Sequence, residues 1–184
     1  MSSRFKTVFL CVIMLFTFTG LSFAADVALT SVGQSPDGMM VRVVLRNVLK
    51  IDPFFNALMT PSDLTAEKVL IAVVGGSSKG LGAAGINSDE EASRAKSLLQ
   101  AAKDKGVKVL VMHVGGEGRR GTLSDLFITE AAPFADGMII VDGGNSDGIF
   151  TKIAEPINAK ILTAPNVKGT GAPLKEFLAE WGVM

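Results

Sequence analysis

The sequence contains no tyrosine, one cysteine, one histidine and one tryptophan among its 184 residues. Cys11 lies in an apolar segment near the amino terminus, so the rest of the chain has no disulfide, thiol nucleophile or thiolate metal site. A single histidine, His113, excludes a metal site built from several histidines, and we expect no bound metal. Basic and acidic residues balance at 18 each. This balance argues against nucleic-acid binding, which requires a basic surface.

The first 24 residues have the pattern of an export signal. Arg4 and Lys6 form a basic start, residues 7–23 are almost entirely apolar, and small residues occupy the Ser22 and Ala24 positions. These are the features of a signal-peptidase site. We expect cleavage after Ala24 and a periplasmic or secreted protein. The alternative is an uncleaved membrane anchor, because the apolar run approaches the length of a short spanning helix, about 17 residues.

Residues 25–184 repeat one pattern five times: a short apolar run, a glycine-rich turn and a helical segment. They carry 16 basic and 18 acidic side chains, a net charge of −2, and their 160 residues suit a single domain. The apolar runs are rich in valine and isoleucine, as in a parallel sheet covered by helices on both faces. The pattern predicts a three-layer α/β sandwich with a five-stranded parallel sheet, Rossmann-like, in the flavodoxin-like order 2-1-3-4-5. The predicted strands are residues 26–31, 68–74, 108–114, 137–141 and 160–164.

Two connections between strands permit more detailed predictions. Ser88, with Glu91 three residues later, fits a capping box at the start of a helix, and Gly106 can end that helix. Residues 51–67 contain two prolines and two adjacent phenylalanines. We expect a short helix and a loop there, with both phenylalanines packed against the edge of the core. The alternative is an apolar lid or a partner-binding surface, because long connections are often functional.

All five glycine-rich turns follow a predicted strand and precede a predicted helix. In a parallel sheet this arrangement places every one of them at the same, carboxyl edge. Open α/β sheets bind their ligands at that edge, near the point where the strand order reverses. The repeat therefore predicts the location of a binding site.

The turn at residues 73–86, VVGGSSKGLGAAGI, resembles the glycine loop of the short-chain dehydrogenases. Gly76, Gly80 and Gly82 match the Gly-x-x-x-Gly-x-Gly spacing of that family. In that family, however, the loop follows the first strand, and the catalytic Tyr-x-x-x-Lys cannot occur in a chain without tyrosine. The phosphate-binding pattern G-x-x-x-x-G-K-[ST] is absent as well. We therefore interpret the likeness as coincidental and expect no cofactor.

The same turn has groups suited to an anion. Ser77 and Ser78 offer hydroxyl donors, Lys79 adds a charge, and Arg119 and Arg120 from the next turn could bind a carboxylate or a phosphate. Amides at a helix start favour an anion too. The alternative is that the glycines only permit tight turns and the cations are solvated. The predicted ligand-binding residues are Ser35, Gly76, Ser77, Ser78, Lys79, His113, Glu117, Arg119, Arg120, Asp142 and Asn145.

A catalytic hypothesis assigns the role of general base to His113, acting on Ser77 or Ser78 with Glu117 or Asp142 as the acid. No nucleophile elbow G-x-S-x-G surrounds either serine. The alternative is a buried histidine held by hydrogen bonds.

Residues 142–148, DGGNSDG, contain groups found in calcium loops. In EF-hand register, Gly143 takes the first ligand position and Ala154 the position of the bidentate acid, and neither can bind calcium through its side chain. We therefore expect a capped turn, with Asp147 or a neighbour at a helix start.

Four of the five turns together resemble a family of small exported bacterial α/β proteins known only as a domain of unknown function. The stretches that carry the resemblance are TSVGQSPDG, VVGGSSKGLGAAGI, MHVGGEGRRGTLSD and DGGNSDGIFTKIAE. The resemblance implies an exported Rossmann-like domain and no activity. Our first hypothesis is an extracytoplasmic module that binds a small anion, with a membrane transporter or another protein as its partner. The alternative is an exported hydrolase that uses His113 and a turn serine.

Overall fold

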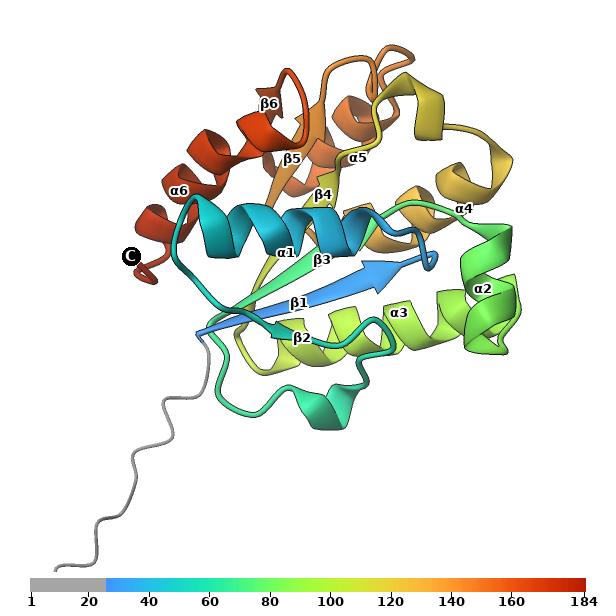
Figure 1. The fold of residues 1–184 in the computed structure, drawn as a ribbon, viewed down its shortest axis with the longest axis horizontal. Coiled ribbons are helices and arrows are strands. Elements are labelled where there is room, and N and C mark those ends of the chain that lie inside the picture. The colour runs from blue at the N-terminus through green and yellow to red at the C-terminus, as the bar shows by residue number, and fades with distance from the viewer. Residues whose placement is uncertain (1–25) are drawn as a thin grey trace, which may run out of the picture.

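Six parallel strands form one sheet, in the order β2-β1-β3-β4-β5-β6 (Figure 1). The computed structural model describes residues 26–184, so the expected export signal and its cleavage site lie outside the described residues. The strands are β1 (Val27–Val32), β2 (Phe54–Phe55), β3 (Val69–Val74), β4 (Lys108–His113), β5 (Gly137–Val141) and β6 (Lys160–Ala164). In Figure 1 the arrow of β1 points to the right, toward the side of the molecule on which the short helix α2 stands.

The predicted α/β class, with an all-parallel sheet, is confirmed, but the predicted number of five strands is wrong. The sixth strand is β2, which pairs with β1 through Ala28↔Phe54 and Leu29↔Phe55. In the predicted order 2-1-3-4-5, the second strand, residues 68–74, lies at the edge of the sheet. In the structure β2 lies at that edge instead. The corresponding strand, β3, instead pairs with both β1 and β4. A strand of two residues shows no periodicity, so the sequence contains no signal from which it could be predicted.

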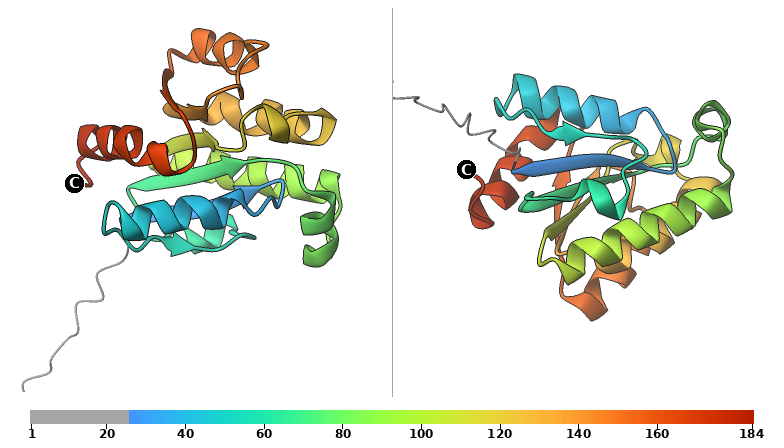
Figure 2. Two further views of the ribbon diagram at one scale, coloured as in Figure 1. Left: turned by 45° about the horizontal axis from the view of Figure 1, so that its top comes forward. Right: turned by 90° about the horizontal axis from the view of Figure 1, so that it is seen from below.

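Residues 26–184 contain six α-helices, of which five cover the two faces of the sheet. Figure 2 shows α1 and α6 on one face and α3, α4 and α5 on the other, with α2 beyond the strand ends. None of these helices is long and apolar enough to span a membrane. The helices are α1 (Asp37–Asn47), α2 (Ser78–Ala84), α3 (Ser88–Asp104), α4 (Thr122–Ala131), α5 (Ile149–Ile157) and α6 (Gly171–Glu180). Four 3₁₀ helices join them: η1 (Pro61–Asp63), η2 (Glu117–Arg119), η3 (Ala132–Phe134) and η4 (Lys168–Thr170).

Two apolar cores lie on opposite faces of the sheet. Alternate residues of each central strand point into one core or the other, and every residue of β1 and β3 is buried. Phe127 and Phe150 fill the core under α4 and α5, while Leu45 and Phe177 fill the core under α1 and α6. Burial on both faces explains why the strands read as continuous apolar runs.

The long helix α3 begins one residue from the predicted position. Its capping box is formed by Asn87 and Glu90. The side chain of Asn87 accepts a hydrogen bond from the Glu90 amide, and the side chain of Glu90 accepts one from the Asn87 amide. The predicted pair of Ser88 and Glu91 has the same spacing but does not form the box, which leaves Glu91 free for a buried contact described below. Gly106 follows the helix with a φ of +71°, as predicted for its end.

The connection between α1 and β3 contains a short helix, the 3₁₀ helix η1, as expected, together with the strand β2, which was not expected. Phe55 packs against the core under α1, and the guanidinium of Arg42 lies 5.5 Å from the centre of its ring. Phe54 remains 38% exposed. Only one of the two phenylalanines therefore packs in the way that the sequence predicts.

Candidate functional site

The turns that follow β1, β3 and β4 pack against one another at the carboxyl edge of the sheet. The amide of Ser77 donates to the carbonyl of Gly33 over 2.9 Å, and the amide of Ser35 donates to that of Gly75 over 3.2 Å. The amide of Gly76 donates to Ser124 Oγ at the start of α4, over 2.9 Å. These contacts tie three separate turns into one rim, in the place that the sequence pattern predicts.

Two glycines of the loop that resembles a nucleotide site, Gly76 and Gly80, are required by this packing. A Cβ atom at Gly80 would overlap with the carbonyl oxygen of Gln34, and one at Gly76 would lie 2.6 Å from Leu123 Cγ. Ser77 caps α2 by accepting a hydrogen bond from the Gly80 amide. The amides of Gly76, Ser77 and Gly80 are therefore already bonded inside the protein and are not free to surround a phosphate.

A cleft of about 360 Å³ opens between the β3–α2 loop and the β4–α4 loop. It brings together Gly76, Ser78, Arg119 and Arg120, four of the residues that the sequence predicts for an anion site. Lys79 is exposed on the neighbouring helix α2. The lining residues are Gly76, Ser78, Gly118, Arg119, Arg120, Gly121, Thr122, Leu123 and Ser124.

Arg120 is fully engaged by contacts within the protein. Its guanidinium donates to Asp125 over 2.7 Å, to Asp147 over 2.8 Å and to the Gly144 carbonyl over 2.6 Å. These hydrogen bonds raise the pKa of Arg120 above its ordinary value and lower the pKa values of both carboxylates. Only 11% of the side chain is exposed. Arg120 therefore holds α4 to the turn before α5 and has few donors left for a ligand.

Arg119 directly precedes Arg120 in the chain, but its side chain is more exposed and has fewer contacts within the protein. Its side chain is 39% exposed and lines the cleft, and its stem passes so close to Gly115 that a Cβ there would overlap with it. Among the described residues its one carboxylate partner is Asp37, with Nη2 3.9 Å from Oδ1. That distance is longer than a hydrogen bond. Arg119 is thus the cation of the cleft that a ligand can reach.

Asp37, the first residue of α1, is a residue that sequence reasoning did not select. Its side chain is only 2% exposed, and no donor among residues 26–184 forms a hydrogen bond with Oδ2. Ser35, which the sequence does predict for the site, is buried beside it, and its hydroxyl accepts a 3.4 Å hydrogen bond from the Asp37 amide. Buried carboxylate oxygens almost always have a donor, so an unpartnered one calls for an explanation. In the sequence, the stretch SPDG that contains Asp37 indicates only a turn, so no local pattern marks Asp37 as a site residue.

His113 is completely buried at the end of β4. Its Nδ1 lies 3.1 Å from the Val74 carbonyl oxygen and its Nε2 lies 3.1 Å from the Gly116 carbonyl oxygen. Both ring nitrogens therefore face acceptors, and neither offers a lone pair to a serine hydroxyl. Glu117 and Asp142 are exposed. The geometry agrees with the alternative of a buried, hydrogen-bonded histidine and does not support the hydrolase hypothesis.

The DGGNSDG turn caps α5, as the sequence predicts. Asn145 Oδ1 accepts a hydrogen bond from the Phe150 amide over 2.9 Å, and Asp147 Oδ1 accepts one from the Ile149 amide over 3.2 Å. Asp142 and Asn145 also line a separate cavity of about 240 Å³ beside Thr163. The structure therefore does not bring these two predicted site residues into the cleft of Arg119.

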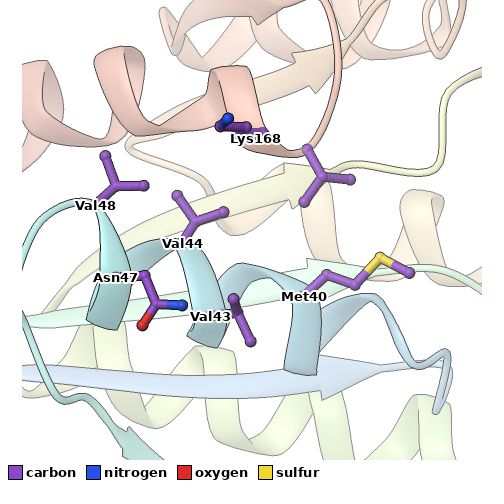
Figure 3. A pocket seen from close by; sticks show the side chains of 7 residues that line it. Met40, Val43, Val44, Asn47, Val48 and Lys168 are labelled. Carbon is purple, nitrogen blue, oxygen red and sulfur yellow. The ribbon is translucent and has the colours of Figure 1, made fainter.

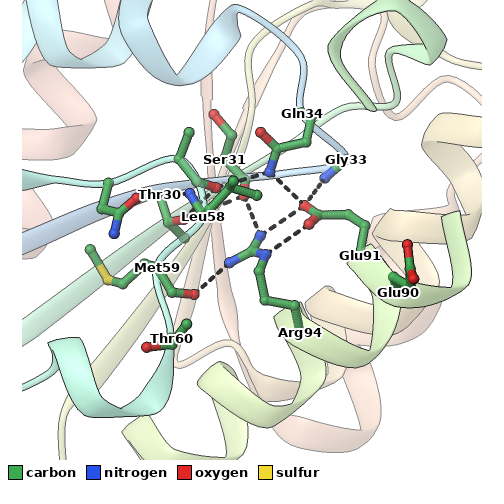
Figure 4. Close-up of polar contacts among 12 residues, drawn as sticks. Thr30, Ser31, Gly33, Gln34, Leu58, Met59, Thr60, Glu90, Glu91 and Arg94 are labelled. Atoms are coloured by element: carbon green, nitrogen blue, oxygen red, sulfur yellow. Dashed lines mark hydrogen bonds and ion pairs between the residues drawn. The ribbon is translucent and has the colours of Figure 1, made fainter. Parts of the chain in front are cut away.

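A buried ion pair on α3 anchors the turn after β1 (Figure 4). Arg94 donates to Glu91 over 2.7 and 2.8 Å and to the carbonyl oxygens of Ser31 and Met59, each over 2.7 Å. Glu91 in turn accepts a hydrogen bond from the Gly33 amide. The pair thereby links α3 to β1, to the turn that carries Ser35 and Asp37, and to the loop after β2.

A larger cavity, about 440 Å³, lies along α1 beside η4 (Figure 3). Its lining is almost entirely apolar, and Lys168 is the one charged residue on it. Such a surface offers a polar metabolite few hydrogen bonds, so we do not assign the ligand site to it. The lining residues are Met40, Val43, Val44, Asn47, Val48, Val167 and Lys168.

Comparison with known proteins identifies the family. A family profile described as "Domain of unknown function (DUF6305)" matches residues 24–178. No curated protein and no solved structure matches the chain. The resemblance to a domain of unknown function is thus confirmed, and the chain belongs to the DUF6305 family.

Proposed function

We propose that this domain binds a small molecule through an anionic group, in the cleft at the carboxyl edge of the sheet. The observation that carries the proposal is the contrast between two neighbouring arginines. The guanidinium of Arg120 is hydrogen-bonded to Asp125 and Asp147. Arg119, in contrast, lines the cleft with no carboxylate within hydrogen-bond distance among the described residues. An arginine can bind a carboxylate or phosphate with two parallel hydrogen bonds.

Other features of the cleft support an anionic ligand. The hydroxyl groups of Ser78 and Thr122 lie at exposed positions of its lining and can donate hydrogen bonds. The cleft also lies against the loop after β3, one of the two strands between which the strand order reverses, and open α/β sheets bind ligands near that point. With the export signal proposed for residues 1–24, the protein would be an extracytoplasmic binding module, and a membrane transporter or another protein would be its partner.

The experiment is a ligand screen by thermal shift and calorimetry with acetate, citrate, phosphate, sulfate and nucleotides. We expect at least one anion to stabilise the protein and to lose its effect in Arg119→Ala. The matched control is Arg46→Ala, since Arg46 is exposed on α1 and contacts only Asp52, at 3.3 Å, among the described residues. The proposal fails if no anion binds, or if the Arg119 and Arg46 variants bind equally well.

A further inference from the structure

We propose that the ligand of this cleft is a zwitterion of the amino-acid type, with its carboxylate on Arg119 and its ammonium group on Asp37. This inference rests on the proposed function, because it takes the cleft as the binding site. It goes further by assigning a second recognition residue and the chemical class of the ligand.

The first argument is the state of Asp37. The carboxylate is almost completely buried, and its Oδ2 lacks a donor within residues 26–184. A Cβ atom at Gly75 would lie 3.1 Å from this oxygen and 2.8 Å from Ser35 Oγ, so only a glycine fits against these two side chains. A buried acceptor without a donor in the described part of the chain is what a ligand donor group would satisfy.

The second argument is the balance of charge. At 3.9 Å the Arg119 guanidinium offsets the charge of Asp37 without forming a hydrogen bond to it. If Arg119 turned to bind a simple anion, the pocket would hold two negative charges and one positive charge. A zwitterion avoids this excess of negative charge, since its carboxylate pairs with Arg119 while its ammonium group pairs with Asp37. Buried charges are tolerated only when they are paired in this way.

The third argument is access. Arg119 lines the cleft, and its Nη2 lies 3.9 Å from Asp37 Oδ1, so the buried carboxylate is one side chain away from the cleft. It belongs to a short 3₁₀ helix between Gly116 and Gly121, whose φ angles are +59° and +133°. Because the side chain is partly exposed and not hydrogen-bonded to Asp37, it can move outward into the cleft. That movement would open the path to Asp37.

The donor side of the ligand can be matched in detail. An ammonium group carries three N–H donors. Asp37 Oδ2 can accept one of them, and the hydroxyl oxygen of Ser35, buried next to it, can accept a second. A hydroxyl group of a hydroxy acid would supply one donor and no positive charge. The site is therefore expected to prefer the amino acid to the corresponding hydroxy acid.

The test is calorimetry on the purified protein with each of the common L-amino acids in turn. For each one that binds, its des-amino acid and its decarboxylated amine are measured as well. We expect the amino acid to bind about 10- to 100-fold more tightly than either fragment, the range for a buried hydrogen bond to a charged group. In Asp37→Asn we expect a similar loss for the amino acid and no loss for the des-amino acid. Asp52→Asn, at an exposed position beyond the other end of α1, is the control.

The outcomes separate this inference from the proposed function. If simple carboxylates or phosphate bind through Arg119 but the amino group adds no affinity, the zwitterion is excluded and the anion site stands. If Asp37→Asn binds the amino acid as tightly as the unmodified protein does, Asp37 has no recognition role and the inference is overturned. If neither amino acids nor anions bind, both proposals fail. Should Asp37→Asn not fold, the fragment series on the unmodified protein still decides the question.

Discussion

Glu91 and Gly33 are separated by 58 positions in the sequence, yet Glu91 Oε1 accepts a 2.8 Å hydrogen bond from the Gly33 amide. The same carboxylate is paired with Arg94, which also holds the Ser31 carbonyl. A helix on one face of the sheet thus holds the turn that begins α1 on the other face. Because Asp37 opens α1, this buried pair helps to hold the segment that carries Asp37 in place.

We expect Glu91→Gln to destabilise the protein strongly. The change leaves the buried guanidinium of Arg94 without its counter-charge, which typically costs about 3 to 5 kcal/mol. Urea denaturation followed by circular dichroism measures the effect. The control is Glu130→Gln, which removes a partly exposed pair with Lys96 at 3.8 Å and should cost less than about 1 kcal/mol. Equal losses in the two variants would contradict the anchoring role of Glu91.

Two glycines of the loop that resembles a nucleotide site should respond oppositely to alanine. Gly80→Ala places a methyl group against the Gln34 carbonyl oxygen and should cost about 1 to 3 kcal/mol. Gly82 lies in the same helix with nothing within 4 Å of its Cβ position, so Gly82→Ala should stabilise by about 0.5 to 1 kcal/mol. Thermal unfolding of both variants checks this. Similar shifts in the same direction would show that close packing is not the reason for Gly80.

The contribution of Arg120 to stability should depend on pH. Its hydrogen bonds lower the pKa values of Asp125 and Asp147 in the folded protein. A carboxylate with a lower pKa in the folded state stabilises the fold above its unfolded pKa, about 3.9. That stabilisation is lost as the pH falls toward the folded pKa.

We therefore expect Arg120→Gln to be less stable than the unmodified protein at pH 7, with a smaller difference at pH 3. Urea denaturation at pH 7, 4 and 3 provides the comparison. Arg46→Gln serves as the control, because both partners of the pair of Arg46 and Asp52 are exposed, and it should show little effect at any of these values. A difference for Arg120→Gln that stays constant over the whole range would refute the assignment.

Without a ligand, Asp37→Asn should raise the melting temperature. The mutation loses the favourable interaction of Asp37 with the start of α1, about 0.3 to 1 kcal/mol. It also removes a buried charge whose Oδ2 has no donor in the described part of the chain, a penalty of about 1 to 3 kcal/mol. The second effect is the larger, so we expect a net gain. A clear loss of stability would mean that the contact with Arg119 supports the fold, and that Asp37 needs no ligand to explain it.

The fold class, the positions of the main strands and the edge at which the turns meet could all be predicted from the sequence. These features follow from local patterns. Strands buried on both faces must be continuously apolar, as in β1 and β3, and a glycine such as Gly106 ends a helix because it tolerates a positive φ. The start of α3 was missed by one residue because Asn87 and Ser88 are each followed, three residues later, by a glutamate.

The tertiary structure alone decided which polar groups are available to a ligand. Arg119 and Arg120 are equivalent in sequence, but only Arg120 meets Asp147 from a distant turn. His113 is enclosed by the carbonyl groups of Val74 and Gly116, and Asp37 is buried by segments remote from it in the chain. Burial and pairing depend on neighbours in space, which no local pattern records, and so the chemistry of the site appears only in the folded molecule.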